Sequence, residues 1–394
     1  MRIAHVITRM IVGGAQENTL LNCQDLIRVH GDEVLLITGP ALGPEGDLLA
    51  QHADQTVPVR MIPSLRRAIH PWRDWSSYRQ IRRQLLEFRP DVVHTHSAKA
   101  GILGRMAAWS LRVPAVIHTV HGAPFHPYQS WAPRAAFAAC ERFAAGRCHA
   151  MISVADAMTE LLVAARVAPR DKFTTIYSGM ELDPFRGADQ AREATRKHFG
   201  FGPDQIVIGK IARLFHLKGH EYVLQAAARL VASQPQVRFL FVGDGILRAD
   251  YESWIRQRGL DDYFRFAGLV PPGRIPEMIG AMDILVHASL REGLARALPQ
   301  ALLAGKPIVS FDVDGAREVC VDNQTGYLVP AKDVDALTAA LARLAADPEQ
   351  RTSMGRRGRA ACEAKFDHLQ MTQRIRELYL RILNSGTLFR PEAD

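Results

Sequence analysis

Short runs of β-branched and other apolar residues alternate with longer amphipathic stretches along the first half of this 394-residue chain. This alternation is typical of a parallel β-sheet covered by helices, because two parallel neighbours need a long crossover connection. Helices are predicted in the intervals, for example over Ala15–His30, Trp75–Phe88 and Ala98–Leu111. The predicted strands are Ile3–Ile7, Val34–Thr38, Val92–His96, Ala115–Thr119, Ala150–Val154 and Phe173–Tyr177.

A second series of the same kind follows an interruption at residues 178–204, where glycines, prolines and charged residues break the pattern. Helices at Tyr222–Ser233 and Val334–Ala345 separate the strands of this series. The strands are predicted at Ile206–Ile211, Val237–Val242, Arg265–Ala267, Ile284–Val286, Ile308–Phe311 and Tyr327–Val329. Two complete series predict an α/β protein with two Rossmann-like, doubly wound lobes facing each other across a cleft.

Composition and charge exclude several other classes of protein. Hydrophobic residues at 47% and charged residues at 23% are ordinary for a globular protein. No apolar run approaches the ~18–20 residues of a membrane-spanning helix, and the start "MRIAHVITRM" suggests a strand rather than a signal peptide. The five cysteines form no C-x-x-C pair, which favours reduced thiols and a cytoplasmic location. The net charge of +8 suits an anionic partner without selecting one.

The residues just beyond the strands are the candidate ligand contacts, because open α/β sheets bind ligands outside the carboxyl ends of their strands. Gly13 and Gly14 follow the first strand, where glycine allows close approach of the backbone; a plain tight turn is the alternative. Arg213 and Lys218 follow the first strand of the second lobe. A guanidinium and a mobile ammonium at that point suit a diphosphate, and a solvated basic loop is the alternative.

The stretch "REGLARALPQALLAGKP" at residues 291–307 contains a second candidate site. Pro299 has no N–H and is tolerated best in a first helical turn, so the helix is predicted to start near residues 296–299. Residues 292–295 then form a loop in which the carboxylate of Glu292 can accept hydrogen bonds from hydroxyl groups. Gln300 is expected in the first helical turn, near the same ligand.

Several histidines lie at the ends of predicted strands in the first lobe. His121, followed by a glycine, is better placed for ligand contact than His118, for which a core position is the ordinary outcome. His94 and His96 have a spacing that invites a metal site, but no cluster of carboxylates or thiols accompanies them. We therefore predict no metal site from the sequence.

These residues, taken together, resemble glycosyltransferase family 4, whose members have the GT-B fold and use nucleotide sugars. The resemblance covers nearly the whole chain, and its specificity lies in the order and spacing of modest motifs. The motifs are "GGAQ" (13–16), "DVVHTHSAKAGILGR" (91–105), "HG" (121–122), "ARLFHLKG" (212–219), "FVGDG" (241–245), "FAGLV" (266–270), "REGLARALPQALLAGKPIV" (291–309) and "TGYLVP" (325–330). The chain departs from the family at one point, because the second glutamate of the family's Glu-x7-Glu pair is Gln300 here.

The resemblance implies a role for each matching residue. Glu292 and His121 would be the catalytic residues that contact the transferred sugar. The other implied contacts are Arg213, Lys218 and Gly14 for the donor diphosphate, Gly293, Leu294 and Ala295 for the donor sugar, Gln300 for the ribose, and Gly243, Gly268 and Val270 for the base. Glutamine can accept from one ribose hydroxyl and donate to the other, so Gln300 is expected to weaken this contact rather than abolish it.

The implied activity is retaining transfer of a sugar from a nucleotide sugar to an acceptor, such as a lipid-linked or cell-surface polysaccharide precursor. Arg213 and Lys218 would stabilise the leaving diphosphate, so no metal or other cofactor is expected. Two alternatives stay open at the level of sequence. One is a sugar-nucleotide epimerase of the same fold, and the other is a non-catalytic nucleotide-sugar binder, which the replacement at Gln300 suggests.

Residues 64–90 of the first lobe contain seven arginines interleaved with Trp72, Trp75 and Tyr78. An ordinary amphipathic helix explains this segment, but a peripheral contact with the anionic inner face of a membrane, near a lipid-linked acceptor, is a second interpretation. Nucleic acid is not expected as a partner, because no recognition motif accompanies the arginines.

A helix over 366–383 is predicted to cross back to the first lobe. The predicted domains are then 1–185 with the C-terminal helix 366–385, and 186–365.

Overall fold

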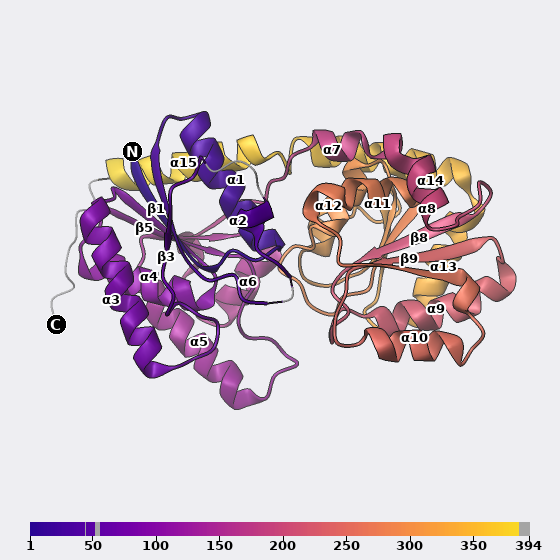
Figure 1. The fold of residues 1–394 in the computed structure, drawn as a ribbon, viewed down its shortest axis with the longest axis horizontal. Coiled ribbons are helices and arrows are strands. Elements are labelled where there is room, and N and C mark those ends of the chain that lie inside the picture. Colours follow the sequence, from indigo (N-terminus) through magenta and orange to yellow (C-terminus); the bar gives the residue numbers. More distant parts are fainter. Residues whose placement is uncertain (44, 52–55, 386–394) are drawn as a thin grey trace. The chain divides into compact units, whose positions relative to one another are not determined.

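The computed structural model describes residues 1–43, 45–51 and 56–385 (Figure 1). The chain forms two compact units and passes between them twice. The first unit is Met1–Met180 together with the chain from His368 onward, and the second unit is Glu181–Asp367. Each unit contains one sheet whose strands all pair in parallel.

The sheet of the first unit has seven strands in the order β3-β2-β1-β4-β5-β6-β7. Every residue of β4 and β5 is buried, as expected for parallel strands that are covered on both faces. The strands are β1 Arg2–Arg9, β2 Glu33–Gly39, β3 Val59–Met61, β4 Val92–His96, β5 Ala115–Val120, β6 Ala150–Ser153 and β7 Phe173–Thr175.

Helices cover both faces of this sheet (Figure 1). His94 of β4 bonds to Tyr379 of α15, whereas a Cβ atom at Gly104 of α4 would lie 2.8 Å from the side chain of Thr95. Because neighbouring strand residues point to opposite faces, α15 and α4 lie on opposite sides of the sheet. The helices are α1 Gly14–Arg28, α2 Leu48–Gln51, α3 Pro71–Phe88, α4 Ala98–Ser110, α5 Trp131–Ala145, α6 Asp156–Ala164 and α15 His368–Asn384.

Helix α15 packs beside α1, so the last helix returns to the first unit as the sequence predicts (Figure 1). Polar contacts fix its position: Asn22 Nδ2 donates to Thr372 Oγ1 over 3.1 Å, and Arg376 Nε lies 2.8 Å from Asp32 Oδ2. The apolar stripe of α15 is buried in the core of the first unit, with its last member partly exposed: Met371, Ile375, Leu378, Tyr379 and Ile382.

The sheet of the second unit has six strands in the order β10-β9-β8-β11-β12-β13. Its core is formed by apolar side chains of these strands and of the helices beside them. The strands are β8 Ile206–Ile211, β9 Val237–Val242, β10 Phe264–Gly268, β11 Ile284–His287, β12 Ile308–Phe311 and β13 Gly326–Val329.

Helices α9, α10 and α13 lie on one side of the second sheet, and α8, α11, α12 and α14 lie on the other (Figure 1). Local sequence sets several starts: the side chains of Asp333 and Asp347 accept from Ala336 N and Gln350 N, each over 2.8 Å, and cap α13 and α14. The helices are α7 Asp183–Arg186, α8 Arg192–His198, α9 His220–Ser233, α10 Arg248–Arg256, α11 Ile275–Ala281, α12 Ala297–Leu303, α13 Val334–Ala346 and α14 Pro348–Glu363.

The twelve predicted strands are all found, and each of their ends lies within two residues of the predicted position. Strand β3 was not predicted, because it has only three residues and two of them, Arg60 and Met61, are exposed and interrupt any apolar pattern. Within the described ranges, no helix combines the length and the apolar character needed to cross a membrane.

Candidate active site

The predicted donor-site residues of the second unit lie at one edge of its sheet. Strand β8 pairs with β9 on one side and with β11 on the other, so the order of the strands reverses at β8. Arg213 and Lys218 follow β8, and Glu292 follows β11. The crevice outside the carboxyl ends of strands at such a reversal is the usual ligand site of an open α/β sheet.

Lys218 and Glu292 are in direct contact at this edge. Lys218 Nζ donates to Glu292 Oε1 over 2.6 Å, and the two side chains are 22% and 21% exposed. The pair is therefore accessible, yet shielded enough for its charges to act strongly. An ammonium beside a carboxylate offers donors for phosphate oxygens and acceptors for sugar hydroxyls.

Glu292 is a carboxylate at neutral pH. Burial by itself would raise the pKa of Glu292, but the neighbouring Lys218 ammonium outweighs it, and the pKa is lowered from its ordinary value. His287 Nε2 lies 3.7 Å from Glu292 Oε1, which is too far for a hydrogen bond. Burial lowers the pKa of His287 to about 3, so this ring is neutral and forms no ion pair with Glu292.

Asp314, which the sequence analysis missed, holds the backbone of the Glu292 loop. Its Oδ2 accepts from Glu292 N over 2.6 Å. Asp314 begins the short 3-10 helix η5, Asp314–Glu318, and has a positive φ of 47°, a conformation that costs a non-glycine residue about 1–3 kcal/mol. The position of Glu292 is therefore fixed from both its side chain and its backbone.

The loop and helix boundary predicted for residues 291–307 is confirmed. Residues 292–295 are outside any helix, and α12 begins at Ala297. Gln300 lies in the first turn, where its N–H donates to Arg296 O over 3.1 Å, and it is 9% exposed. The loop residues Gly293, Leu294 and Ala295 are partly exposed.

The loop between β8 and α9 is pressed against the end of β11. Gly219 has a φ of 68°, and a Cβ atom there would lie 1.8 Å from Ala288 O, so only glycine fits this position. This approach holds Lys218 next to the Glu292 loop. Arg213 is exposed on the same loop, with its guanidinium 5.1 Å from the centre of the Phe215 ring.

Two of the three residues predicted for the base pocket are joined by the backbone. Gly243 N donates to Gly268 O over 2.9 Å, and both residues have positive φ values, 133° and 68°. A Cβ atom at Gly243 would lie 2.2 Å from Ala212 O, in the loop that follows β8. Val270 is partly exposed two residues beyond Gly268. These glycines therefore let two loops of the carboxyl edge approach each other closely.

Lys210 is a further polar residue behind this site that the sequence analysis missed. It lies in β8, is fully buried, and its Nζ has no hydrogen-bond partner among the described residues. Burial lowers its pKa to about 7, and the charges of Glu292 and Lys218 also act on it. A lysine within the apolar run "IVIGKI" was the available signal. Perturbed and unpartnered buried groups of this kind are typical of functional sites.

The predicted site residues of the first unit also follow strand ends. His121 comes directly after β5, and its Nε2 lies 3.1 Å from Nδ1 of His96, the last residue of β4. Gly14 is the first residue of α1, after the neighbouring strand β1. His118 is 2% exposed and bonds to Thr95 Oγ1 over 2.9 Å, so it is a core residue, as the sequence suggested.

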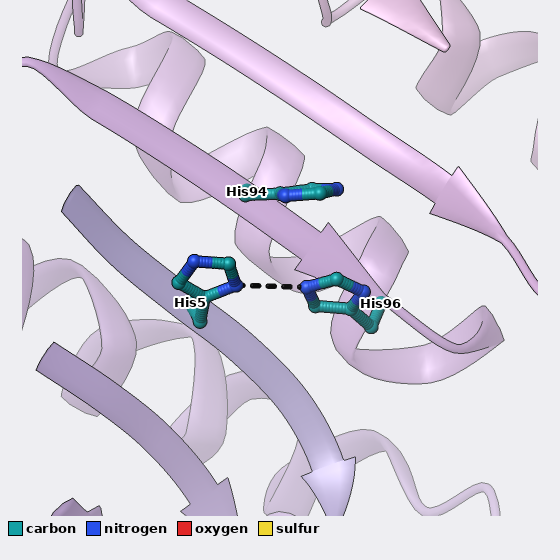
Figure 2. Close-up of side chains that lie close together, drawn as sticks. All are labelled: His5, His94 and His96. Atoms are coloured by element: carbon teal, nitrogen blue, oxygen red, sulfur yellow. Dashed lines mark hydrogen bonds between the residues drawn. The ribbon is translucent and has the colours of Figure 1, made fainter. Parts of the chain in front are cut away.

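His5, His94 and His96 form a buried cluster in the first unit (Figure 2). One ring nitrogen from each lies within 4.8 Å of the others, a spacing that would allow a metal ion among the described residues. The spacing of His94 and His96 is visible in the sequence, but no motif there links His5 to them. Pairing of β1 with β4 puts His5 in register with His94, and that pairing is a property of the fold.

The fold and the sites define a class of protein. Each unit is a doubly wound parallel sheet, and the carboxyl edge of the second sheet presents two cationic side chains and a carboxylate. Two such lobes in one chain, with cationic side chains at the carboxyl edge of the second and a last helix that returns to the first, are the architecture of a GT-B transferase.

Comparison with known proteins identifies the family. Residues 14–179 match the family described as "Glycosyl transferase 4-like domain", and residues 191–361 match "Glycosyl transferases group 1". The chain is a glycosyltransferase of family 4 with the GT-B fold.

One curated relative and several solved structures resemble the chain over most of its length. The UDP-Gal:alpha-D-GlcNAc-diphosphoundecaprenol alpha-1,3-galactosyltransferase of Escherichia coli is 27% identical over 382 residues, which cover 96% of this chain and 97% of the relative. The structure of Anabaena Alr3699/HepE in complex with UDP and glucose is 22% identical, with a TM-score of 0.81 and coverage of 96% and 99%. The sucrose-phosphate synthase of Thermosynechococcus elongatus is 20% identical, with a TM-score of 0.81 and coverage of 98% and 100%.

Proposed function

We propose that this glycosyltransferase moves a sugar from a UDP-sugar to a saccharide carried on a lipid diphosphate, with retention of anomeric configuration. The contact between Lys218 and Glu292 at the reversal of the second sheet carries the proposal, because it combines an anion-binding cation with an acceptor for sugar hydroxyls. The Escherichia coli relative, matched over nearly its full length, supports both the uridine donor and the lipid-linked acceptor by its name.

Arg213 and Lys218 bind the donor diphosphate in this proposal. Charge grows on the diphosphate as its bond to the anomeric carbon breaks, and fixed cations stabilise that charge. The exposed guanidinium of Arg213 can reach outward to the phosphates, whereas Lys218 is held at the sheet edge by Glu292. These two side chains supply the positive charge, so we propose that the reaction needs no metal ion. Gly14 is proposed to allow close approach of the backbone to the donor diphosphate.

The remaining residues are proposed to contact the sugar, the ribose and the base of the donor. Glu292 accepts from hydroxyls of the transferred sugar, with backbone contacts from Gly293, Leu294 and Ala295, and His121 is a further proposed contact of the sugar. Gln300 holds the ribose, and the base lies near Gly243, Gly268 and Val270. In the transfer step, the acceptor oxygen bonds to the anomeric carbon on the face that the diphosphate leaves. The proton of the acceptor hydroxyl passes to the leaving phosphate oxygen.

Helix α3 is the proposed contact with an anionic membrane. Trp72 and Trp75 are 80% and 58% exposed and lie on the same face as Arg79 and Arg83, at helical spacing. Ile69, just before the helix, is 77% exposed. Exposed aromatic rings beside arginines fit the interface of a bilayer with acidic headgroups. A lipid-linked acceptor is available only at such a surface, so this contact supports the proposed substrate.

A panel of nucleotide sugars tests the donor and the reaction together. The purified protein is incubated with UDP-, GDP- and ADP-sugars, with and without a lipid-diphosphate saccharide, and free nucleoside diphosphate is measured. We expect release of UDP that depends on the acceptor, and a product whose new linkage has the anomeric configuration of the donor. Conversion of the donor to its epimer without UDP release, or donor binding without any turnover, would overturn the proposal.

Flotation with vesicles tests the membrane contact separately. We expect the protein to float with vesicles that contain anionic phospholipid and to remain unbound with neutral vesicles. Replacing both Trp72 and Trp75 by alanine should abolish flotation. Replacing Trp254, which lies under the Arg258 guanidinium in the second unit, serves as a matched tryptophan control and should leave flotation unchanged. Equal flotation of the double variant would refute the role of α3.

A further inference from the structure

Three histidines of the first unit form a continuous hydrogen-bonded chain that ends at His121. His5 Nδ1 lies 3.0 Å from His96 Nε2, and His96 Nδ1 lies 3.1 Å from His121 Nε2. The rings come from β1, from the end of β4 and from the residue after β5. Figure 2 shows the first of these bonds between His5 and His96. Both separations fit one N–H···N hydrogen bond.

The inner rings of the chain are neutral. His5 is 0% exposed and His96 is 1% exposed. Burial lowers the pKa of His5 to about 3, and it holds the pKa of His96 well below its ordinary value. The titratable groups that act on His96 are themselves histidines, His94 and His118 in addition to its two partners, and they oppose its charging. No carboxylate is among these groups to stabilise an imidazolium.

With His121 in its neutral form, as the two inner rings are, counting protons leaves two arrangements for the chain. Each neutral imidazole has one proton, so the chain has three, and each of the two ring–ring bonds needs one. The third proton must lie on a nitrogen at one end of the chain. It is on His5 Nε2 if every bond is donated inward, from His121 toward His5. It is on His121 Nδ1 if every bond is donated outward.

The inner end of the chain decides between these arrangements. His5 Nε2 is buried and has no hydrogen-bond partner among the described residues. A buried N–H without an acceptor is rarer and costlier than a bare nitrogen that accepts nothing. His121 is only partly buried, so a proton on its outer nitrogen lies where solvent, protein or ligand oxygens can accept it. The outward arrangement is therefore favoured.

We propose that His5 and His96 are positioning residues that hold His121 in the tautomer with its proton on Nδ1, so that His121 donates a hydrogen bond to its ligand. The proposal rests on the proposed function for the identity of that ligand, a sugar or phosphate oxygen of the donor. In this tautomer Nδ1 has no lone pair. His121 therefore stabilises oxygen charge and does not act as the base that deprotonates the acceptor.

The same geometry argues against a metal ion in the cluster of His5, His94 and His96. His94 is already bonded at both nitrogens, with Nδ1 2.5 Å from Tyr379 OH and Nε2 2.6 Å from Thr119 Oγ1. His96 is bonded at both nitrogens within the chain. A metal would have to replace several of these bonds, because it needs lone pairs that converge on one point.

Nitrogen NMR of histidine-labelled protein measures the tautomer directly at neutral pH. The spectrum distinguishes the protonated from the bare nitrogen of each ring, and the His121→Asn variant assigns the signals of His121. We expect His121 to be protonated at Nδ1. His149 is an internal control with the opposite tautomer, because its Nδ1 accepts from Val116 N over 2.9 Å. A His121 ring protonated at Nε2 would overturn the proposal.

A double-mutant cycle tests whether the inner ring acts through His121. The His5→Phe variant should lower kcat by roughly tenfold, the effect of losing one hydrogen bond, and should mix the two tautomers of His121. Adding His5→Phe to His121→Asn should lower kcat no further. The His94→Phe variant is equally buried but lies outside the chain, so it should lower the melting temperature and leave the His121 tautomer unchanged.

The outcomes separate this proposal from the proposed function. Full activity of His121→Asn would remove its role in transfer, whereas the tautomer measurement in the wild type does not depend on activity. Additive losses in the double variant would show that His5 is merely structural. Stoichiometric uptake of added zinc that removes the proton between His5 and His96 would overturn the hydrogen-bonded chain.

Discussion

Replacing Glu292 by glutamine tests the assigned donor site, because it keeps the size of the side chain and removes its charge. Glu292 Oε1 accepts from Lys218 Nζ over 2.6 Å, and both side chains are about four-fifths buried. A hydrogen bond to a charged group contributes about 1.5–3 kcal/mol. Loss of ~1.5–3 kcal/mol from the transition state lowers kcat/KM by roughly 10- to 150-fold.

The assay is the initial rate of UDP release at several donor concentrations, with thermal unfolding measured on the same samples. The control is Glu277→Gln, which breaks an exposed ion pair of 3.0 Å with Arg274 in the same unit. This control should change the free energy of unfolding by less than about 0.5 kcal/mol and leave kcat/KM unaltered. A Glu292→Gln enzyme within about threefold of the wild-type kcat/KM would refute the assignment.

Glu292→Gln should also change how the free energy of unfolding depends on pH in acid. The pKa of Glu292 is lowered by folding, so its ionisation stabilises the folded state above the ordinary carboxyl pKa. That contribution is lost as the pH falls through the folded value. The free energy of unfolding of Glu292→Gln should therefore fall less steeply with acid than that of the wild type. Parallel acid profiles would contradict the ion pair with Lys218.

Three further predictions follow from single positions. Gln300→Glu should bind the donor at least as tightly as the wild type and up to about tenfold more tightly by calorimetry, because a carboxylate accepts from both ribose hydroxyls; weaker binding would argue against the ribose contact. Folding lowers the pKa of Lys210 from 10.5 to about 7, so the unfolded chain binds more protons between these values and wild-type stability should rise with pH there. Lys210→Met should remove this rise, which is at most about 1.4 kcal/mol per pH unit, in denaturant titrations; identical pH profiles would contradict it. Gly219→Ala should lose at least about 2 kcal/mol of stability, because its Cβ atom would meet Ala288 O in a left-handed conformation, whereas Gly273→Ala, with open space around it, should be neutral in the same melts.

Local pattern predicted most of the fold because each strand is a short apolar run between helical stretches. Strand β3 was not predicted, because three residues, two of them exposed, are too few to show an alternating apolar pattern. The start of α12 could be placed because Pro299 tolerates only the first turn of a helix, and this constraint is local.

The candidate site was predicted only in part, for a related reason. Residues that follow strand ends, such as Lys218, Glu292 and His121, can be chosen from the sequence, since parallel strands end at one edge of a sheet. The contact of Lys218 with Glu292 could not be predicted from the sequence in this way, because the two residues are 74 positions apart in the chain. Asp314 was missed because its carboxylate acts on a backbone N–H, which leaves no motif.

The sequence by itself therefore determined the two series of strands and helices, the family, and which side chains follow the ends of the strands. Only the tertiary structure decided which of these side chains meet. It placed His5 in register with His94, so that His5 bonds to His96 two residues further along β4. It also buried Lys210 in β8, near the charges of Glu292 and Lys218. The physical reason is that hydrogen bonds and burial depend on strand order and register, and these arise from packing across the whole sheet.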